Sequence, residues 1–182
     1  AVQFEAMAAE YERPIYLLCL RMMGNREDAQ DCAQEALLRA FRAFDRFRDD
    51  ASPKTWLYRI AYNTCIDELR RRRGVVSLDT LREGGFDLPD AKAERAYEQL
   101  EHKERCELVK QAMEQLPEDQ RAALVLREFQ QLSYEEIANA LQQPEGTIKS
   151  RINRAREKVK NFVRQAEQNG CSSVKENEGR QK

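Results

Sequence analysis

The chain has 182 residues, which is enough for one ordinary domain or two small ones. Charged residues make up 35% of it and hydrophobic residues 41%, a balance typical of soluble proteins. The longest apolar run covers only residues 15–20, far fewer than the roughly 20 residues that a membrane span requires, so we expect no membrane insertion. The formal net charge of −1 conceals a segregation of basic and acidic residues along the chain.

Two helices are expected in the first 44 residues. Apolar residues recur at helical spacing through residues 4–22, interrupted at Pro14, which can start a second helix or kink a long one. Gly24 is expected to end this segment and Asn25 to cap the next helix, with an acidic residue three positions on. The apolar face of that next helix comprises Ala29, Cys32, Ala33, Ala36, Leu37, Ala40, Phe41 and Phe44. Spacing alone predicts an ordinary solvated side opposite, made of Asp31, Gln34, Glu35 and Leu38.

A third helix is expected to start at Ser52 and Pro53 and to end at Gly74. Its buried face comprises Leu57, Ile60, Ala61 and Thr64. Another side brings together Trp56, Arg59, Asn63 and Arg70. Six cations oppose two anions from Lys54 to Arg73. Such a surface suits single-stranded or melting DNA, because aromatic rings stack on unpaired bases and cations follow the backbone. The alternative for a lone Trp is a place in the core.

The middle of the chain is acidic and rich in helix breakers. Seven acidic residues oppose three basic ones within residues 74–101, which indicates a linker. A helix is expected to resume near Ala91 or later and to continue to Leu116, and Pro117 starts the next one. The residues of that helix expected to be buried are Ala122, Ala123, Leu126 and Phe129. From Gln165 onward the composition is of a kind that rarely packs.

Residues 133–160 have the pattern of a helix-turn-helix. A short helix at 134–141 is followed by breakers at 142–146, and Thr147 can cap a second helix. The second helix carries an apolar stripe of Ile148, Ile152, Ala155 and Val159. Opposite the stripe lie Ser150, Asn153 and Arg154, with Lys149 and Arg151 on its flanks. Seven cations oppose one anion between Thr147 and Arg164, which favours contact with a phosphate backbone over a merely solvated amphipathic helix.

The sequence offers little support for metal binding or catalysis. Five cysteines are scattered without a CxxC pair, and an odd number cannot all pair internally, so reduced cytoplasmic thiols are the simpler interpretation. His102 and Cys106 are four residues apart on an expected helix, but two ligands are too few for a metal site. We found no phosphate-cradling glycine loop or nucleophile elbow, and we expect no cofactor and no enzymatic activity.

Three motif blocks give the chain a family resemblance. They read NREDAQDCAQEALLRAF, WLYRIAYNTCIDELRRR and QLPEDQRAALVLREFQQLSYEEIANALQQPEGTIKSRINRARE. In this order and spacing the chain resembles bacterial extracytoplasmic-function sigma factors, the promoter-recognition subunits of RNA polymerase, over residues 4–162. The resemblance implies an all-α fold of two small helical domains joined by a linker, the second containing the helix-turn-helix. The expected boundaries are 1–73 for the first domain, 74–103 for the acidic linker, 104–167 for the second domain and 168–182 for a flexible tail.

The resemblance also implies roles for individual residues and several partners. The residues implied to bind core RNA polymerase are Asp31, Gln34, Glu35 and Leu38. Those implied to bind the −10 promoter element are Lys54, Trp56, Arg59, Asn63 and Arg70, with the loop 47–54 cradling a flipped base. Those implied to bind the −35 element are Thr147, Lys149, Ser150, Arg151, Asn153 and Arg154. The implied partners are the clamp helices and flap of the polymerase, promoter DNA and an anti-sigma factor.

One position in the turn departs from the family pattern. Many relatives have Gly where this chain has Gln142, and a left-handed conformation there is less comfortable without Gly. The main hypothesis is therefore a sigma factor that directs polymerase to promoters and helps to melt the −10 region. The alternative is a free-standing helix-turn-helix regulator, which would bind a two-fold operator without polymerase.

Overall fold

The computed structural model describes residues 2–47, 52–75 and 96–178. These residues form seven α-helices and one short 3-10 helix, with no strand among them, which confirms the all-α prediction. In chain order the elements are α1 (Val2–Met23), α2 (Arg26–Ala43), η1 (Phe44–Arg46), α3 (Pro53–Val75), α4 (Ala96–Glu114), α5 (Glu118–Glu128), α6 (Tyr134–Leu141) and α7 (Glu145–Glu178). No helix of the described part of the chain is long and apolar enough to cross a membrane.

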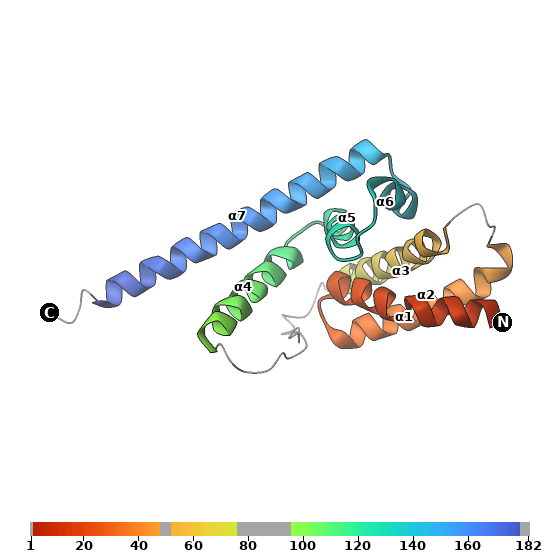
Figure 1. Cartoon of the computed structure of the whole chain (residues 1–182), viewed down its shortest axis with the longest axis horizontal. Helices are drawn as coiled ribbons and strands as arrows, with labels where there is room; N and C mark the ends of the chain where they lie inside the picture. Colours follow the sequence, from red (N-terminus) through yellow and green to blue (C-terminus); the bar gives the residue numbers. More distant parts are fainter. Residues whose placement is uncertain (1, 48–51, 76–95, 179–182) are drawn as a thin grey trace.

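The first three helices pack against one another and form the first domain (Figure 1). α1 is one continuous helix with Pro14 inside it, so the Pro does not separate two helices. Gly24 adopts φ +81°, a left-handed conformation that glycine reaches without strain, and so ends α1. The side chain of Asn25 accepts a hydrogen bond from the backbone N–H of Asp28 at 2.9 Å, which confirms the predicted cap of α2.

The second domain consists of α4 to α7. α7 is the longest helix, and α4 lies antiparallel beside it, while α5 and α6 pack near its N-terminal end (Figure 1). The turn after α6 passes through Gln142, whose φ and ψ are 52° and 48°. This is the left-handed conformation for which Gly would be more comfortable, so the anticipated strain at Gln142 is present.

The structure corrects the expected ends of the last helix. α7 begins at Glu145, because the carbonyl of Pro144 accepts hydrogen bonds from the N–H groups of Thr147 at 2.9 Å and Ile148 at 3.1 Å. Thr147 therefore lies in the first turn and is not the cap. α7 also continues to Glu178, beyond the expected change at Gln165. In this extension Glu167 forms an ion pair of 3.0 Å with Arg105 of α4, a contact that the composition of the tail does not reveal.

The segment between the domains lies largely outside the described residues. α3 ends at Val75 and α4 begins at Ala96, in agreement with a helix that resumes near Ala91 or later. The rest of the expected acidic linker, residues 76–95, is outside the described residues, as is most of the expected base-cradling loop at 48–51.

A capping box fixes the start of α6. The side chain of Ser133 accepts from the N–H of Glu136 at 3.1 Å, and the carboxylate of Glu136 accepts from the N–H of Ser133 at 2.7 Å. Replacing Ser133 by Ala removes one of these bonds, so we expect Ser133→Ala to lower the free energy of unfolding by ~1 kcal/mol. Chemical denaturation followed by circular dichroism measures this loss. Ser133→Thr keeps the hydroxyl and should stay close to the parent; an equal loss in both variants would contradict the cap as the cause.

The apolar residues confirm most of the expected buried faces and correct two positions. Ile148, Ile152 and Ala155 are fully buried, as the stripe predicts. Phe41, expected on the buried face of α2, is 56% exposed, and its ring makes only an edge contact with Phe4, at 5.3 Å between centroids. Phe129, expected in the core, is 45% exposed. Both residues lie near helix ends, where helical spacing no longer fixes which side meets a neighbour.

Candidate nucleic-acid interfaces

The outward face of α2 carries three of the four residues predicted on it. Asp31 and Gln34 are exposed, and the side chain of Leu38 is 50% exposed. Phe41 follows Leu38 three residues on, so an apolar pair extends this polar face towards the end of α2. Exposed apolar side chains with a polar rim are typical of protein-binding surfaces, so this face can bind a protein partner.

The fourth predicted residue, Glu35, lies beside Asp31 with its side chain 42% exposed, and it is also linked to α3. Its carboxylate accepts a hydrogen bond from Nε of Arg39 at 2.8 Å, and Nη1 of Arg39 donates to Asp67 of α3 at 2.9 Å. These two carboxylates raise the pKa of Arg39, so the guanidinium stays charged and links the helices. A polar cavity of about 340 Å³ lies beside this network and is lined in part by Cys32. Glu35 is therefore held by Arg39 while remaining accessible beside Asp31.

The predicted DNA-facing stripe of α3 is only partly exposed. Asn63 and Arg70 are exposed and Arg59 is half-buried. Trp56 is 7% exposed, and its ring packs against Phe47 with 4.8 Å between centroids. In this structure the Trp ring is thus part of the core, while the amide and the cations can meet a ligand.

The helix-turn-helix exposes the polar side of α7. Asn153 and Arg154 are exposed on the side away from fully buried Ile148 and Ile152. Lys149 is exposed and pairs with Glu145 at 2.6 Å, one turn earlier. Because exposed pairs of this kind contribute little, Lys149 is free to exchange its partner for a phosphate or a base.

Three other predicted residues of α7 make contacts within the protein. Thr147 is half-buried, and its carbonyl accepts from the hydroxyl of Ser150 at 2.8 Å. Arg151 is half-buried and pairs with Asp119 of α5 at 2.9 Å. Asp119 therefore orients Arg151 within the second domain, and a bound phosphate would have to compete with this pair.

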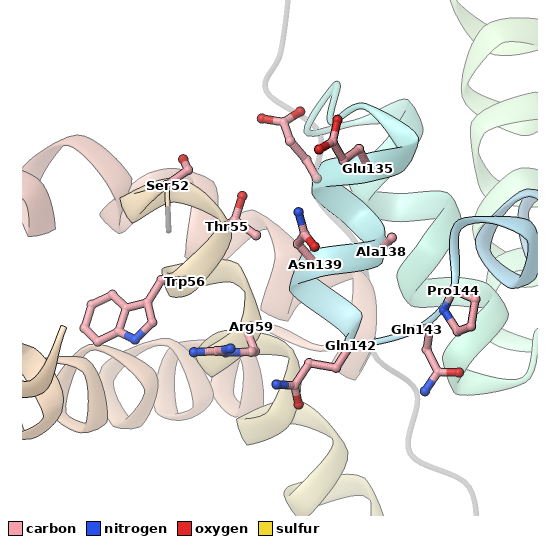
Figure 2. Close-up of a pocket in the computed structure, with 11 residues that line it drawn as sticks. Ser52, Thr55, Trp56, Arg59, Glu135, Ala138, Asn139, Gln142, Gln143 and Pro144 are labelled. Atoms are coloured by element: carbon pink, nitrogen blue, oxygen red, sulfur yellow. The ribbon is translucent and has the colours of Figure 1, made fainter. Parts of the chain in front are cut away.

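A cavity of about 750 Å³ separates part of α3 from α6 and the turn after it. Trp56 and Arg59 line it from α3, and Asn139, Gln142 and Pro144 line it from the second domain. Figure 2 shows Arg59 and Gln142 on facing sides of this space, with Glu135 at the start of α6. Residues from both predicted DNA-reading units therefore meet at one place.

Some relevant residues were not found from the sequence. The capping box at Ser133 could have been recognised in the sequence, since Ser133 and Glu136 are three residues apart before an apolar run. No sequence pattern marks Arg121 and Gln130, because their hydrogen-bond partners lie about a hundred residues away in the first domain.

The described residues hold no cluster suited to a metal ion. No group of three or more His, Cys, Asp or Glu side chains among them could hold one. Cys19, Cys32 and Cys65 are buried in the first domain as free thiols. The side chains of His102 and Cys171 lie outside the part of the chain that the structure describes.

Each of the two domains matches a known protein family. The family described as "Sigma-70 region 2" matches residues 7–75, and "Sigma-70, region 4" matches residues 106–159. These ranges correspond to α1–α3 and to the larger part of α4–α7.

Similar proteins match both domains together. The chain is 42% identical over 165 residues to the RNA polymerase sigma-H factor of Pseudomonas aeruginosa, covering 86% of this chain and 83% of the relative. It is 38% identical over 165 residues to the extracytoplasmic-function RNA polymerase sigma-E factor of Escherichia coli, covering 88% and 86%. The solved structure of the sigma factor RpoE in complex with the anti-sigma factor NepR, from Bartonella quintana, superposes with a TM-score of 0.72 at 25% identity, covering 90% of this chain and 98% of that one. Because these relatives match along both domains, a free-standing regulator is not favoured. The chain belongs to the extracytoplasmic-function RNA polymerase sigma factors and acts in transcription initiation.

Proposed function

We propose that the chain is a non-enzymatic subunit that gives core RNA polymerase its promoter specificity and leaves catalysis to the polymerase. In this proposal the exposed face of α2 binds the clamp helices of the largest subunit. Asp31, Gln34, Glu35 and Leu38 make the contacts, with Arg39 holding the Glu35 carboxylate in place. The combination of an exposed Leu with neighbouring polar groups supports this assignment, because such mixed patches are characteristic of protein interfaces.

The observation that carries the DNA-binding proposal is the two-sided character of α7. Ile148, Ile152 and Ala155 in its N-terminal half are fully buried, which fixes the rotation of this part of the helix and places Asn153 and Arg154 outward. Lys149, one turn before Asn153, lies on the same exposed side. An amide and two cations held in this way can read base edges in the major groove of the −35 element, with Thr147, Ser150 and Arg151 in supporting contacts.

The first domain is proposed to take the −10 element. Asn63, Arg59 and Arg70 offer an amide and two cations along one side of α3. Unpaired bases could contact Asn63 while the cations follow the backbone. Trp56 would have to leave its contact with Phe47 to stack on a base, and Lys54 would join the set of phosphate contacts.

A groove on the second domain suits the flap of the polymerase. It has a volume of about 600 Å³, lies between α4, α5 and α7, and is lined by both apolar and charged side chains. Its apolar residues are Val109, Met113, Leu124, Phe129, Val159 and Val163. An apolar groove with charges at its rim can accept one face of an amphipathic helix. We propose that the flap presents such a helix.

An anti-sigma factor is the proposed inhibitor. A relative of known structure, the sigma factor from Bartonella quintana, was solved in complex with one, and it superposes on 90% of this chain. A protein of this kind would inhibit the chain by covering the face of α2 or the groove of the second domain.

Transcription in vitro tests the proposed function. Purified core RNA polymerase is combined with the chain and a broad promoter library, and transcript 5′ ends are mapped. We expect start sites that are absent with polymerase alone and that share upstream and −10 elements. The proposal would be wrong if no promoter in the library gave transcripts that depend on the chain.

A further inference from the structure

Three cysteine thiols meet in the core of the first domain, one from each of its α-helices. Cys19 comes from α1, Cys32 from α2 and Cys65 from α3. Cys19 and Cys65 are 0% exposed, and Cys32 is 4% exposed. The thiol of Cys65 is in hydrogen-bond contact with those of both Cys19 and Cys32, so it is the common neighbour of the other two. None of the three is among the proposed contacts to polymerase or DNA.

Cys32 is the member of this cluster that lines the polar cavity between α2 and α3. The cavity has a volume of about 340 Å³, and neither Cys19 nor Cys65 lines it. The lining also carries five carboxylates and three guanidiniums, those of Asp28, Asp31, Glu35, Asp67, Glu68, Arg39, Arg71 and Arg72. The excess of negative charge disfavours anions, so the cavity best admits a small neutral molecule.

The surroundings of Cys32 favour its thiolate, the reactive form of a cysteine. The thiol of Cys65 donates a hydrogen bond to the Cys32 sulfur, and this contact lowers the pKa of Cys32. The guanidinium of Arg72 acts in the same direction, while burial and the carboxylates of Glu68 and Asp28 oppose it without reversing it. The sulfur beside the cavity is therefore activated.

The pKa of Cys65 moves in the opposite direction. Hydrogen bonds with Cys19 and Cys32, together with burial, raise it. Cys65 therefore keeps its proton while Cys32 carries the thiolate character. One sulfur of the pair is thus suited to attack a reactant, and the other is placed to respond after that reaction.

We propose that Cys32 is an oxidant-reactive thiol and Cys65 its resolving partner, so that a small neutral hydroperoxide entering the cavity converts the pair into a disulfide between α2 and α3. The sulfurs of a disulfide are about 2.05 Å apart. Two thiols already in hydrogen-bond contact can reach this distance by small rotations of their side chains, so no helix has to unfold.

Two steps convert the thiols into the disulfide. First the Cys32 sulfur attacks one oxygen of the hydroperoxide: an S–O bond forms, the O–O bond breaks, and the other oxygen leaves with the thiol proton as water or an alcohol. The Cys65 sulfur then attacks the resulting sulfenic acid: the S–S bond forms, the S–O bond breaks, and hydroxide leaves with the Cys65 proton as water. The two thiols lose two electrons in total, and the hydroperoxide gains them.

The disulfide would act on the proposed polymerase-binding face. Cys32 directly follows Asp31 and lies about one turn before Glu35, and both of these residues line the same cavity. Drawing Cys32 towards α3 therefore moves two proposed polymerase contacts. Weaker polymerase binding after oxidation rests on the proposed function, whereas formation of the disulfide does not.

Peptide mapping of the full chain tests the chemistry. The reduced chain is treated with hydrogen peroxide, alkylated, and digested with trypsin without reductant; Arg residues separate the cysteines in sequence, so each falls in its own peptide. We expect a link between the peptides of Cys32 and Cys65. Cys106 of α4 is the internal reference, because it is more exposed than Cys32 and lies in the second domain. Cys32 should be consumed at least about tenfold faster, against the order of exposure.

The same map can overturn the proposal. Consumption of Cys32 no faster than that of Cys106 would do so, as would the absence of a link between Cys32 and Cys65 in the folded chain. A link between Cys19 and Cys65 in its place would overturn the assignment of Cys32 as the oxidised thiol.

Two variants assign the roles of the thiols. Cys65→Ala removes the resolving partner, so sulfenic acid should persist on Cys32 and be captured there by dimedone. Cys19→Ala is the matched control: it removes the other neighbour of Cys65 and should leave the link between Cys32 and Cys65 intact. Circular dichroism checks the fold of both, and the map of the parent keeps the test decisive if either variant is unstable. Absence of dimedone on Cys32 in folded Cys65→Ala would contradict its role.

Polymerase binding separates this inference from the proposed function. After peroxide is removed, the disulfide form should bind core RNA polymerase about tenfold more weakly than the reduced chain, and dithiothreitol should restore binding. Cys32→Ala should bind equally before and after peroxide. If the disulfide forms but the reduced chain does not bind polymerase, the proposed function fails and the thiol site stands. If the reduced chain binds but peroxide leaves Cys32 reduced, the thiol site fails and the proposed function stands. Equal binding by the reduced and disulfide forms would overturn the effect on polymerase.

Discussion

Leu38→Asp is expected to lower the affinity of the chain for core RNA polymerase about 100-fold, which corresponds to ~2.7 kcal/mol. Leu38 is 50% exposed on α2, between exposed Gln34 and exposed Phe41. An interface there would bury an apolar side chain, and the Asp carboxylate would lose its hydration without gaining a partner. Binding can be measured with labelled chain and purified core polymerase, and transcription should fall in parallel.

Gln111→Asp is the charge control for Leu38→Asp. Gln111 is also exposed but lies on α4 in the second domain, away from α2, and its replacement introduces the same charge. It should bind polymerase within about twofold of the parent. Both variants should keep the thermal stability of the parent, since both side chains are exposed. Equal affinity for polymerase in Leu38→Asp and the parent would remove α2 from the polymerase interface.

Asn153→Ala is expected to reduce discrimination at one base pair of the −35 element by about 10- to 100-fold, the range of ~1–3 kcal/mol typical of a bidentate contact. The Asn153 amide is exposed on α7. Its direction is fixed because the neighbouring residue, Ile152, is fully buried. Asn pairs best with adenine in the major groove, so selection from a randomised promoter library should show relaxed preference for one adenine. The −10 consensus should not change.

Two other Asn residues make the controls for Asn153→Ala. Asn161 is exposed on α7, two turns further along, so Asn161→Ala should leave the selected −10 and −35 sequences unchanged. Asn63→Ala on α3 should change the selected −10 element and spare the −35 element. An identical consensus from the parent, Asn153→Ala and Asn63→Ala would refute the proposed residue roles.

Local signals in the sequence predicted most helix boundaries. Gly24 and Asn25 end one helix and start the next because a left-handed residue and a side-chain cap act within a few residues of each other. The left-handed conformation of Gln142 could be anticipated for the same reason. The start of α7 was misplaced by three residues: Thr147 was expected to be the cap, but Pro144, with its fixed φ, and the acidic Glu145 initiate the helix earlier.

Exposure near helix ends was harder to predict. Phe41 and Phe129 have the hydrophobicity of core residues, and helical spacing placed both on buried faces. Each is about half exposed, because the neighbouring elements do not extend far enough to cover it. Trp56, in contrast, lies on the predicted DNA-facing stripe but is buried by Phe47. Which neighbour reaches a side chain depends on tertiary packing.

The sequence by itself determined the helices, the buried stripe of α7 and the composition of each candidate surface, because periodicity and capping act over distances of a few residues. Only the tertiary structure decided which of these surfaces are open. Tyr58 meets Gln130 72 residues away, and Arg121 meets Met22 99 residues away. No local pattern encodes such pairs, since they depend on how two separately folded domains pack. The sequence alone thus identifies the residues that can contact DNA, whereas their accessibility depends on how the two domains pack.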